Sequence, residues 1–109
     1  MLMLAISYHF YVLPRHREHF RHAYQASRET LQQAQGLVSH QLNEPRSQHE
    51  AFTLLMAWNN RSSFERFIRS WVGVWMLNGM GLERDAFAAP IRTHIGEEES
   101  ALHVDKHVA

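Results

Sequence analysis

The sequence predicts an α+β fold whose elements follow the order strand, helix, strand, strand, helix, strand. Two observations support this order. Hydrophobic side chains alternate with a period of two in four segments, and in two other segments they recur at the spacing of an α-helix. The order is typical of the ferredoxin-like βαββαβ arrangement, in which a four-stranded antiparallel sheet carries both helices on one face.

The first strand is predicted in the uncharged run of residues 4–12. Pro14 ends this strand and suits the first turn of a helix. Because the side chains of a strand point alternately to opposite faces, one face of this strand is strongly apolar. That face holds Leu4, Ile6, Tyr8, Phe10 and Val12.

The first helix is predicted from about residue 15 to residue 34. Its apolar stripe has the spacing i, i+3, i+4, i+7 and i+11, which places these side chains on one side of a helix. Gly36 stops the helix, since glycine enters the left-handed conformation freely. The stripe consists of Phe20, Ala23, Tyr24, Ser27 and Leu31.

Two further strands are predicted at residues 37–43 and 51–58, and the short polar connection between them predicts an antiparallel hairpin. On the first of these strands Val38, His40 and Leu42 share a face. The second is the most apolar strand, and its inward side chains are Phe52, Leu54, Met56 and Trp58.

The second helix begins where Ser62 and Glu65 have the spacing of a capping box. Its predicted buried stripe consists of Phe64, Phe67, Ile68 and Trp71. The Met- and Gly-rich residues 72–83 predict a further turn of helix and then a loop. Trp75 lies in this stretch, which either seals the core or the dimer contact or acts as a lid.

The last strand is predicted at residues 88–95, with Pro90 at its beginning or at an edge. Ile91, Thr93 and Ile95 share one face of it. We therefore expect a single domain over residues 1–96, followed by a polar, acidic tail over residues 97–109.

The second face of the predicted sheet is too apolar to be simply solvated. It would hold Ala5, Tyr11, Leu37, Leu55 and Ala57. Another sheet is the simplest cover for such a face, and a second copy of the chain supplies one. The sequence therefore predicts a homodimer packed sheet to sheet, as in a dimeric α/β barrel.

Composition excludes several classes of function. The 11 basic and 11 acidic residues cancel, which argues against nucleic acid as a partner. The chain has no cysteine, so disulfides, zinc–thiolate sites and thiol nucleophiles are excluded, as is typical of a cytoplasmic protein. No uncharged run is long enough to span a bilayer, and we expect no membrane partner.

Nine histidines raise the question of a metal site. His16, His19 and His22 follow one another in the first helix, but His16 and His22 diverge by about 120° around its axis. Three interleaved arginines would repel a cation. We therefore predict no metal site and interpret these histidines as solvated.

The residues from Trp58 to Ser70 form a pattern. A strand ends in Trp58, Asn59-Asn60-Arg61-Ser62-Ser63 follows, and then come Phe64-Glu65-Arg66-Phe67 and Ser70; upstream, Gln35-Gly36-Leu37-Val38 opens a strand. The pattern resembles the antibiotic biosynthesis monooxygenase (ABM) family over residues 4 to about 96. The resemblance implies a dimeric α/β barrel with a pocket between sheet and helices.

The resemblance also implies chemistry. Members of this family include monooxygenases that oxidise anthrones or quinols with O2 and no cofactor, acting on a small aromatic substrate. On this basis the catalytic candidates are Tyr8, His40 and Trp58, with His94 a further polar candidate on a strand. The candidate substrate-binding residues are Phe10, Met56, Phe64 and Trp75.

Two alternatives remain open. Haem-degrading members of the family carry an asparagine on the first strand and a histidine after the second helix. Here Tyr8 falls at the first place, and no histidine lies between His49 and His94. The second alternative is a dimeric ligand-binding or stress-related protein without catalysis.

The sequence also differs from the anthrone-oxidising branch of the family. In that branch a polar side chain precedes the tryptophan by one pleat repeat and a tyrosine follows it, whereas this chain has Leu54 and Phe64 at those places.

Overall fold

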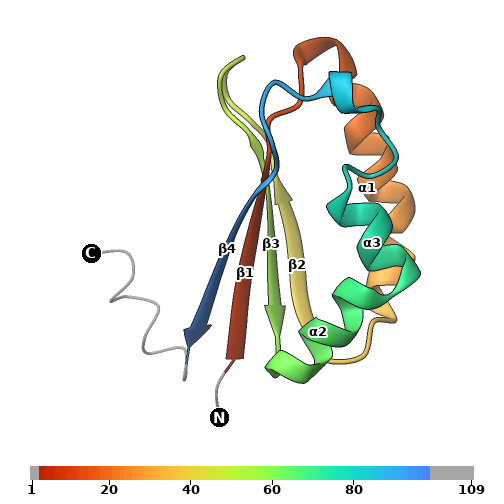
Figure 1. Ribbon diagram of the computed structural model, residues 1–109, viewed down its shortest axis with the longest axis vertical. Helices are drawn as coiled ribbons and strands as arrows, with labels where there is room; N and C mark the ends of the chain where they lie inside the picture. Colours follow the sequence, from red (N-terminus) through yellow and green to blue (C-terminus); the bar gives the residue numbers. More distant parts are fainter. Residues whose placement is uncertain (1–2, 99–109) are drawn as a thin grey trace.

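The fold consists of one antiparallel sheet and one layer of helices (Figure 1). The computed structural model describes residues 3–98. The strands are arranged in the order β2-β3-β1-β4, and the helices cover one face of this sheet. The predicted α+β class and ferredoxin-like arrangement are confirmed. The strands are β1 (Met3–Phe10), β2 (Leu37–Asn43), β3 (Phe52–Trp58) and β4 (Arg92–Glu98).

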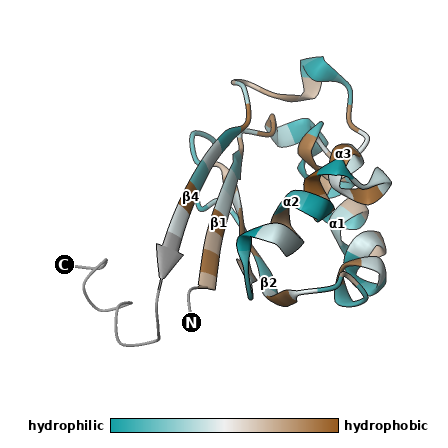
Figure 2. Cartoon of the chain, turned by 60° about the horizontal axis from the view of Figure 1, so that its bottom comes forward, coloured by the Kyte–Doolittle hydropathy of each residue, from teal (hydrophilic) through white to brown (hydrophobic). Residues whose placement is uncertain are grey.

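β1 is a central strand, and its alternation agrees with the prediction. Its register pairs Ile6 with Met56 on β3 and with Ile95 on β4. Its inward side chains are buried against the helices, while the intervening residues are half-buried on the other face. Figure 2 shows brown, hydrophobic segments in both β1 and the helical layer, as burial between two layers requires.

β2 departs from the prediction because it contains a bulge. Leu37 pairs with Trp58, but the next paired residue is Ser39, which lies opposite Ala57. Val38 is therefore an extra residue and is exposed. The predicted placement of Leu37 on the outer face is wrong, because the bulge turns it inward against the core.

The first helix is α1 (Arg17–Gln32), preceded by one 3-10 turn at Pro14–His16. Its predicted stripe is confirmed, with Phe20, Tyr24, Ser27 and Leu31 buried. After α1 the chain turns at Gly36, whose φ of +89° favours glycine. A Cβ atom at Gly36 would lie 2.2 Å from Ser63 Oγ, so this turn packs directly against the next helix.

The predicted second helix is two short helices, α2 (Arg61–Arg69) and α3 (Trp71–Leu77), separated at Ser70. The predicted capping role of Ser62 is wrong. Asn60 caps α2 instead, since its side chain accepts a hydrogen bond from Ser63 N at 2.8 Å. The break at Ser70 also redirects the chain, so that Trp71 is 84% exposed rather than part of the buried stripe.

α2 and α3 meet at Gly73. A Cβ atom at this position would lie 1.9 Å from the backbone oxygen of Phe67, so the close approach of the two helices requires glycine. After α3 the residues Gly79, Met80 and Gly81 all have positive φ angles, and a 3-10 turn at Arg84–Ala86 leads toward β4. The stretch 72–83 thus begins as helix and ends as loop, as predicted.

β4 lies four residues later in the chain than its predicted beginning. It starts at Arg92, after Pro90, and continues to Glu98, so the strand enters the segment expected to be a tail. Ile95 faces the helical side but is half-exposed, because β4 is an edge strand beyond the helices. The remainder of the predicted tail lies outside the described residues. No helix within residues 3–98 is long and apolar enough to cross a membrane.

Candidate functional site

The predicted catalytic residues lie on the inner face of the sheet in three successive rows. Trp58, Met56 and Leu54 follow one another at every second residue of β3. His40 of β2 pairs with Met56, and Tyr8 of β1 pairs with Leu54. Since two residues of a strand span about 7 Å, the row of His40 lies between those of Trp58 and Tyr8. The fold thus places all three toward the helices.

Tyr8 and Trp58 each carry a buried polar atom without a partner. Among the described residues, neither Tyr8 Oη nor Trp58 Nε1 has a hydrogen-bond partner, although both side chains are buried. Burial also raises the pKa of Tyr8 well above its ordinary range, so its hydroxyl stays protonated. A buried donor left unpaired costs about 1–3 kcal/mol. The two donors lie on the face that packs on the helices, two rows of residues apart, and a ligand acceptor at either atom would remove this cost there.

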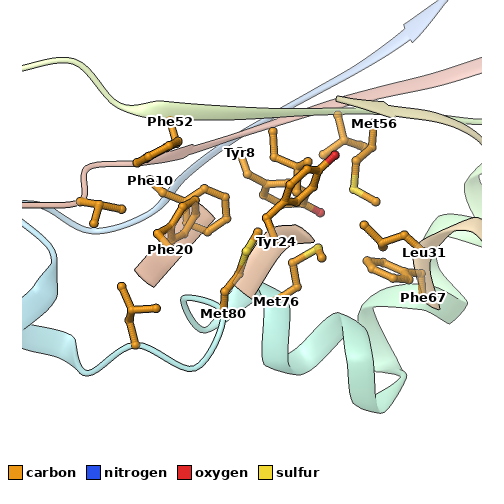
Figure 3. Close-up of a cluster of buried hydrophobic side chains, with 14 of the residues drawn as sticks. Tyr8, Phe10, Phe20, Tyr24, Leu31, Phe52, Met56, Phe67, Met76 and Met80 are labelled. Carbon is orange, nitrogen blue, oxygen red and sulfur yellow. The ribbon is translucent and has the colours of Figure 1, made fainter. Parts of the chain in front are cut away.

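The Tyr8 ring projects from the sheet into the layer of helix side chains (Figure 3). Tyr24 enters the same layer from α1, and Met76 enters it from α3. These surroundings are apolar apart from the two tyrosine hydroxyls. An aromatic hydroxyl in such an environment can donate a hydrogen bond but does not serve as a base.

A pocket of about 310 Å³ opens beside Trp58 between the C-terminal half of α1 and α2. Its inner wall is apolar, and the Trp58 ring lies 5.0 Å from the Phe67 ring, measured between centroids. Its rim is polar and comes from the end of α1, the α1–β2 turn, α2 and Ser70. The lining residues other than Trp58 and Phe67 are Thr30, Gln33, Ala34, Gln35, Ser63, Arg66, Ser70 and Val72.

Ser70 fixes one side of this pocket. Its Oγ donates to the backbone oxygen of Phe67 at 2.6 Å and accepts from Gly73 N at 3.1 Å. The same hydroxyl therefore closes the end of α2 and caps the beginning of α3. Across the mouth, Arg66 Nη1 donates to Gln35 Oε1 at 3.2 Å. The rim is held by contacts between elements that are distant in sequence.

His40 is half-buried and is linked to α1 rather than to the pocket. The Tyr24 hydroxyl and His40 Nδ1 form a hydrogen bond of 2.7 Å, in which the tautomer of His40 determines the donor. Burial lowers the pKa of His40 and raises the pKa of Tyr24, so the neutral forms of both groups predominate at pH 7. His40 does not line the pocket beside Trp58. His94 is further away still, because it pairs with Ser7 on the outer face.

The four predicted substrate-binding residues are dispersed. Phe64 packs beside Trp58, with 6.2 Å between ring centroids, and Met56 lies in the row of His40. Phe10 lies at the other end of the inner face, 5.0 Å from the Phe20 ring in an aromatic cluster. Trp75 lines a separate groove between α1 and α3. None of the four is among the residues that line the pocket beside Trp58, although Phe64 packs against Trp58 itself.

The rim of the pocket is the part that the sequence did not predict. Gln35, Ser63 and Arg66 belong to segments whose patterns indicate only a turn and an exposed helix face. Their convergence depends on Gly36, which lets the α1–β2 turn approach α2. The signal available in the sequence was the combination of Gly36 with the early residues of α2.

The site combines properties that suit an aromatic ligand. It has an apolar inner wall with a large indole, whose Nε1 has no partner among the described residues, and a polar rim with a single positive charge. Tyr8, which carries the other unpartnered donor, does not line this pocket. Within the described residues, no three His, Asp or Glu side chains converge as metal ligands would. Such a pocket can exclude water from a planar ring system and orient it by a few hydrogen bonds.

Comparison with solved structures shows a common fold. A conserved protein from Methanosarcina mazei shares 18% identity with a TM-score of 0.74, covering 88% of this chain and 92% of that one. A Mycobacterium tuberculosis protein shares 15% identity with a TM-score of 0.71, covering 93% and 99%. SnoaB, a cofactor-independent oxygenase from Streptomyces nogalater, shares 13% identity with a TM-score of 0.61, covering 92% and 93%.

The sequence itself points to one family. Comparison with curated protein sequences finds no match. The family described as antibiotic biosynthesis monooxygenase matches residues 3–71, which is more than half of the chain and includes Tyr8, His40 and Trp58. The chain belongs to the antibiotic biosynthesis monooxygenase family.

Proposed function

We propose that this protein is a monooxygenase that oxidises an anthrone-, quinol- or phenol-like aromatic molecule with O2 and without a cofactor. The observation that carries the proposal is the pair of buried, unpartnered donors, Tyr8 Oη and Trp58 Nε1, on the inner face of the sheet. Membership of the family and the fold shared with a cofactor-independent oxygenase support it.

The proposed reaction needs no external reductant. When the methylene carbon of an anthrone becomes a carbonyl, one atom of O2 enters the product and the other leaves as water with the two hydrogens. The substrate supplies all four electrons that reduce O2. The protein must favour the electron-rich anion of the substrate, exclude water and leave room for O2.

Each residue has a distinct role in this proposal. Trp58 stacks on or borders the flat substrate and donates through Nε1 to a substrate oxygen. Tyr8 donates its hydroxyl to the oxygen that bears the developing negative charge. His40, held neutral and oriented by Tyr24, is the candidate acceptor of the substrate proton at Nε2, in the tautomer whose Nδ1–H donates to the Tyr24 oxygen. It lies in the row of Met56, between the rows of Tyr8 and Trp58.

Oxygen uptake tests the proposal. Purified protein is mixed with a panel of anthrones and hydroquinones in the presence of a chelator, and O2 consumption is followed. We expect catalysed uptake of one O2 per molecule oxidised, with one 18O atom from labelled O2 in the product. Absence of catalysed uptake across the panel would contradict the proposal.

Matched variants test the assigned site. Tyr8→Phe and Trp58→Phe each keep a ring and remove a donor, and we expect each to lower the rate of oxygen uptake by about tenfold or more. Tyr11→Phe removes a hydroxyl that lies beyond β1, stacked with Arg92, and is the control. Full activity in Tyr8→Phe, Trp58→Phe and His40→Ala together would discard the site assignment.

Haem does not fit the pocket beside Trp58. The residues that line it include no histidine, methionine or tyrosine that could serve as an axial ligand. His40 is engaged by Tyr24 through Nδ1 and does not belong to the lining. Haem degradation, the alternative that the family resemblance left open, therefore has no axial ligand in this pocket to support it.

The proposal includes a homodimer formed through the outer face of the sheet. This face is hollowed and carries small or apolar residues at its centre, Ala5, Leu55 and Ala57. Leu55 is 39% exposed there, and a small domain gains burial by pairing this face with a second copy. Light scattering should give a dimeric mass at micromolar concentration, and Leu55→Glu should give a monomer. A monomeric wild-type mass would contradict the dimer.

A further inference from the structure

The pocket beside Trp58 has a charged mouth. Of the residues that line it, Arg66 alone has a charged side chain, and none is Asp or Glu. Arg66 is exposed on α2, and one of its five N–H donors is used by Gln35. Because Gln35 is neutral, this hydrogen bond orients the guanidinium without neutralising it.

The charge of Arg66 is also free of an internal counterion. No carboxylate among the side chains described in residues 3–96 forms an ion pair with it, whereas Arg21 pairs with Glu44 at 2.8 Å. The remaining donors of the guanidinium have the planar fork geometry that matches a carboxylate. An anionic ligand group at the mouth would meet attraction from Arg66 and no repulsion from the lining.

The inner end of the pocket has the complementary chemistry. Ala34, Phe67 and Val72 supply apolar walls, and Trp58 supplies a ring whose Nε1 has no partner among the described residues. A ligand that suits both ends has flat aromatic rings inside and an acidic group outside. A volume of about 310 Å³ lies at the small end of the range for ligand pockets and limits the rings to a few.

We infer that this pocket selects aromatic carboxylic acids, and that Arg66 is the residue that binds the carboxylate while the rings lie against Trp58 and Phe67. The inference rests on the proposed function, since it names the substrate class of the same site. Arg66 is a specificity residue here and takes no part in the oxidation.

Calorimetry with two matched ligands tests the inference. The probes are 1-hydroxy-2-naphthoic acid and 1-hydroxy-2-naphthamide, which differ in the charge of one substituent. We expect the wild-type protein to bind the acid about tenfold more tightly than the amide. Arg66→Gln should reduce the affinity for the acid to that for the amide, and leave the affinity for the amide within about twofold. Unchanged binding of the amide also shows that the variant is folded.

Arg69→Gln is the control variant. Arg69 lies on the same helix, is exposed and donates through Nε to the backbone oxygen of Glu65, but does not line the pocket. We expect this variant to keep the tenfold preference for the acid. An equal loss in both variants would show a diffuse effect of surface charge and would overturn the inference.

Other outcomes also decide the matter. Equal wild-type affinities, a preference that survives Arg66→Gln, or no saturable binding of either probe would each overturn the inference. Because calorimetry requires no turnover, its result is separate from that of the oxygen-uptake experiment. A preference for the acid without oxygen uptake would support the acid-binding pocket and contradict the oxygenase. Oxygen uptake without a preference for the acid would support the oxygenase and contradict the acid-binding pocket.

Discussion

The two faces of the sheet are built from the same four strands and differ in almost every other respect. On the inner face, Phe52 and Trp58 are completely buried against the helices. On the outer face, Ser7, Ser39 and Gln41 alternate with small apolar residues and remain partly or largely exposed. The contrast shows that burial of one face determines the fold and places Trp58 in the wall of the pocket, while the other face leaves an apolar side chain, Leu55, 39% exposed.

The largest expected effect comes from truncation on the inner face. Phe52→Ala should lower the free energy of unfolding by about 3–5 kcal/mol, because it leaves a cavity among the packed rings of Phe20 and Phe10. Leu55→Ala, on the outer face of the same strand, should lower the free energy of unfolding of the monomeric chain by less than about 1 kcal/mol. Urea denaturation compares them, and similar losses would contradict the assignment of the two faces.

A smaller effect, of opposite sign, is expected at Tyr8. Tyr8→Phe removes a buried hydroxyl without a partner and should raise the free energy of unfolding by about 1 kcal/mol while lowering oxygen uptake. Tyr24→Phe is the matched control, since its hydroxyl is bonded to His40, and it should lower stability by about 1 kcal/mol. Destabilisation by Tyr8→Phe would show that its hydroxyl has a partner in solution.

Histidines on both faces predict a modest loss of stability in acid. Burial lowers the pKa of His40 on the inner face, and burial with the nearby charges of His94 and Arg92 lowers that of His9 on the outer face. The unfolded chain, with a histidine pKa of about 6.5, then binds more protons than the folded chain just below that pH. Stability should therefore fall as pH drops through 6.5 toward the lowered values.

Denaturation midpoints in urea at pH 7.5 and pH 5.5 measure this effect. His9→Gln and His40→Gln should each flatten the dependence on pH. If stability still falls in acid in both the His9→Gln and the His40→Gln variants, other groups cause the dependence on pH.

The smallest effect on stability is expected at Trp71, an aromatic residue that packs neither in the core nor on the outer face of the sheet. Trp71 begins α3 and is 84% exposed, so Trp71→Ala should change the free energy of unfolding by no more than about 0.5 kcal/mol. Thermal or urea denaturation checks this value. A loss as large as that of Phe52→Ala would mean that this part of α3 is covered in solution.

The sequence predicted what depends on local periodicity. The alternation of β1 and the stripe of α1 each have one apolar side, and burial of that side is enough to place Tyr8 and Tyr24 in the interior. Trp58 followed from the same alternation on β3. These residues could be placed because a period of two or of 3.6 leaves a single way to bury them.

The sequence did not predict features set by a single residue or by contacts across the fold. An extra residue at Val38 reversed the expected facing of Leu37, and a competing cap at Asn60 replaced Ser62. The break at Ser70 exposed Trp71. The pocket rim likewise depends on tertiary contact, since Arg66 meets Gln35 only after α2 has packed on the α1–β2 turn.

The hydroxyl of Ser70 has a consequence for how this pocket can diversify. It accepts from the first turn of α3 and donates to the last turn of α2, so the direction of α3 is set by one oxygen atom. Side chains such as Val72, which α3 presents to the pocket, can then be exchanged without redirecting the helix. Ligand range and scaffold are in this way separable, and a library of substitutions at Val72 would alter what binds beside Trp58 while preserving the fold.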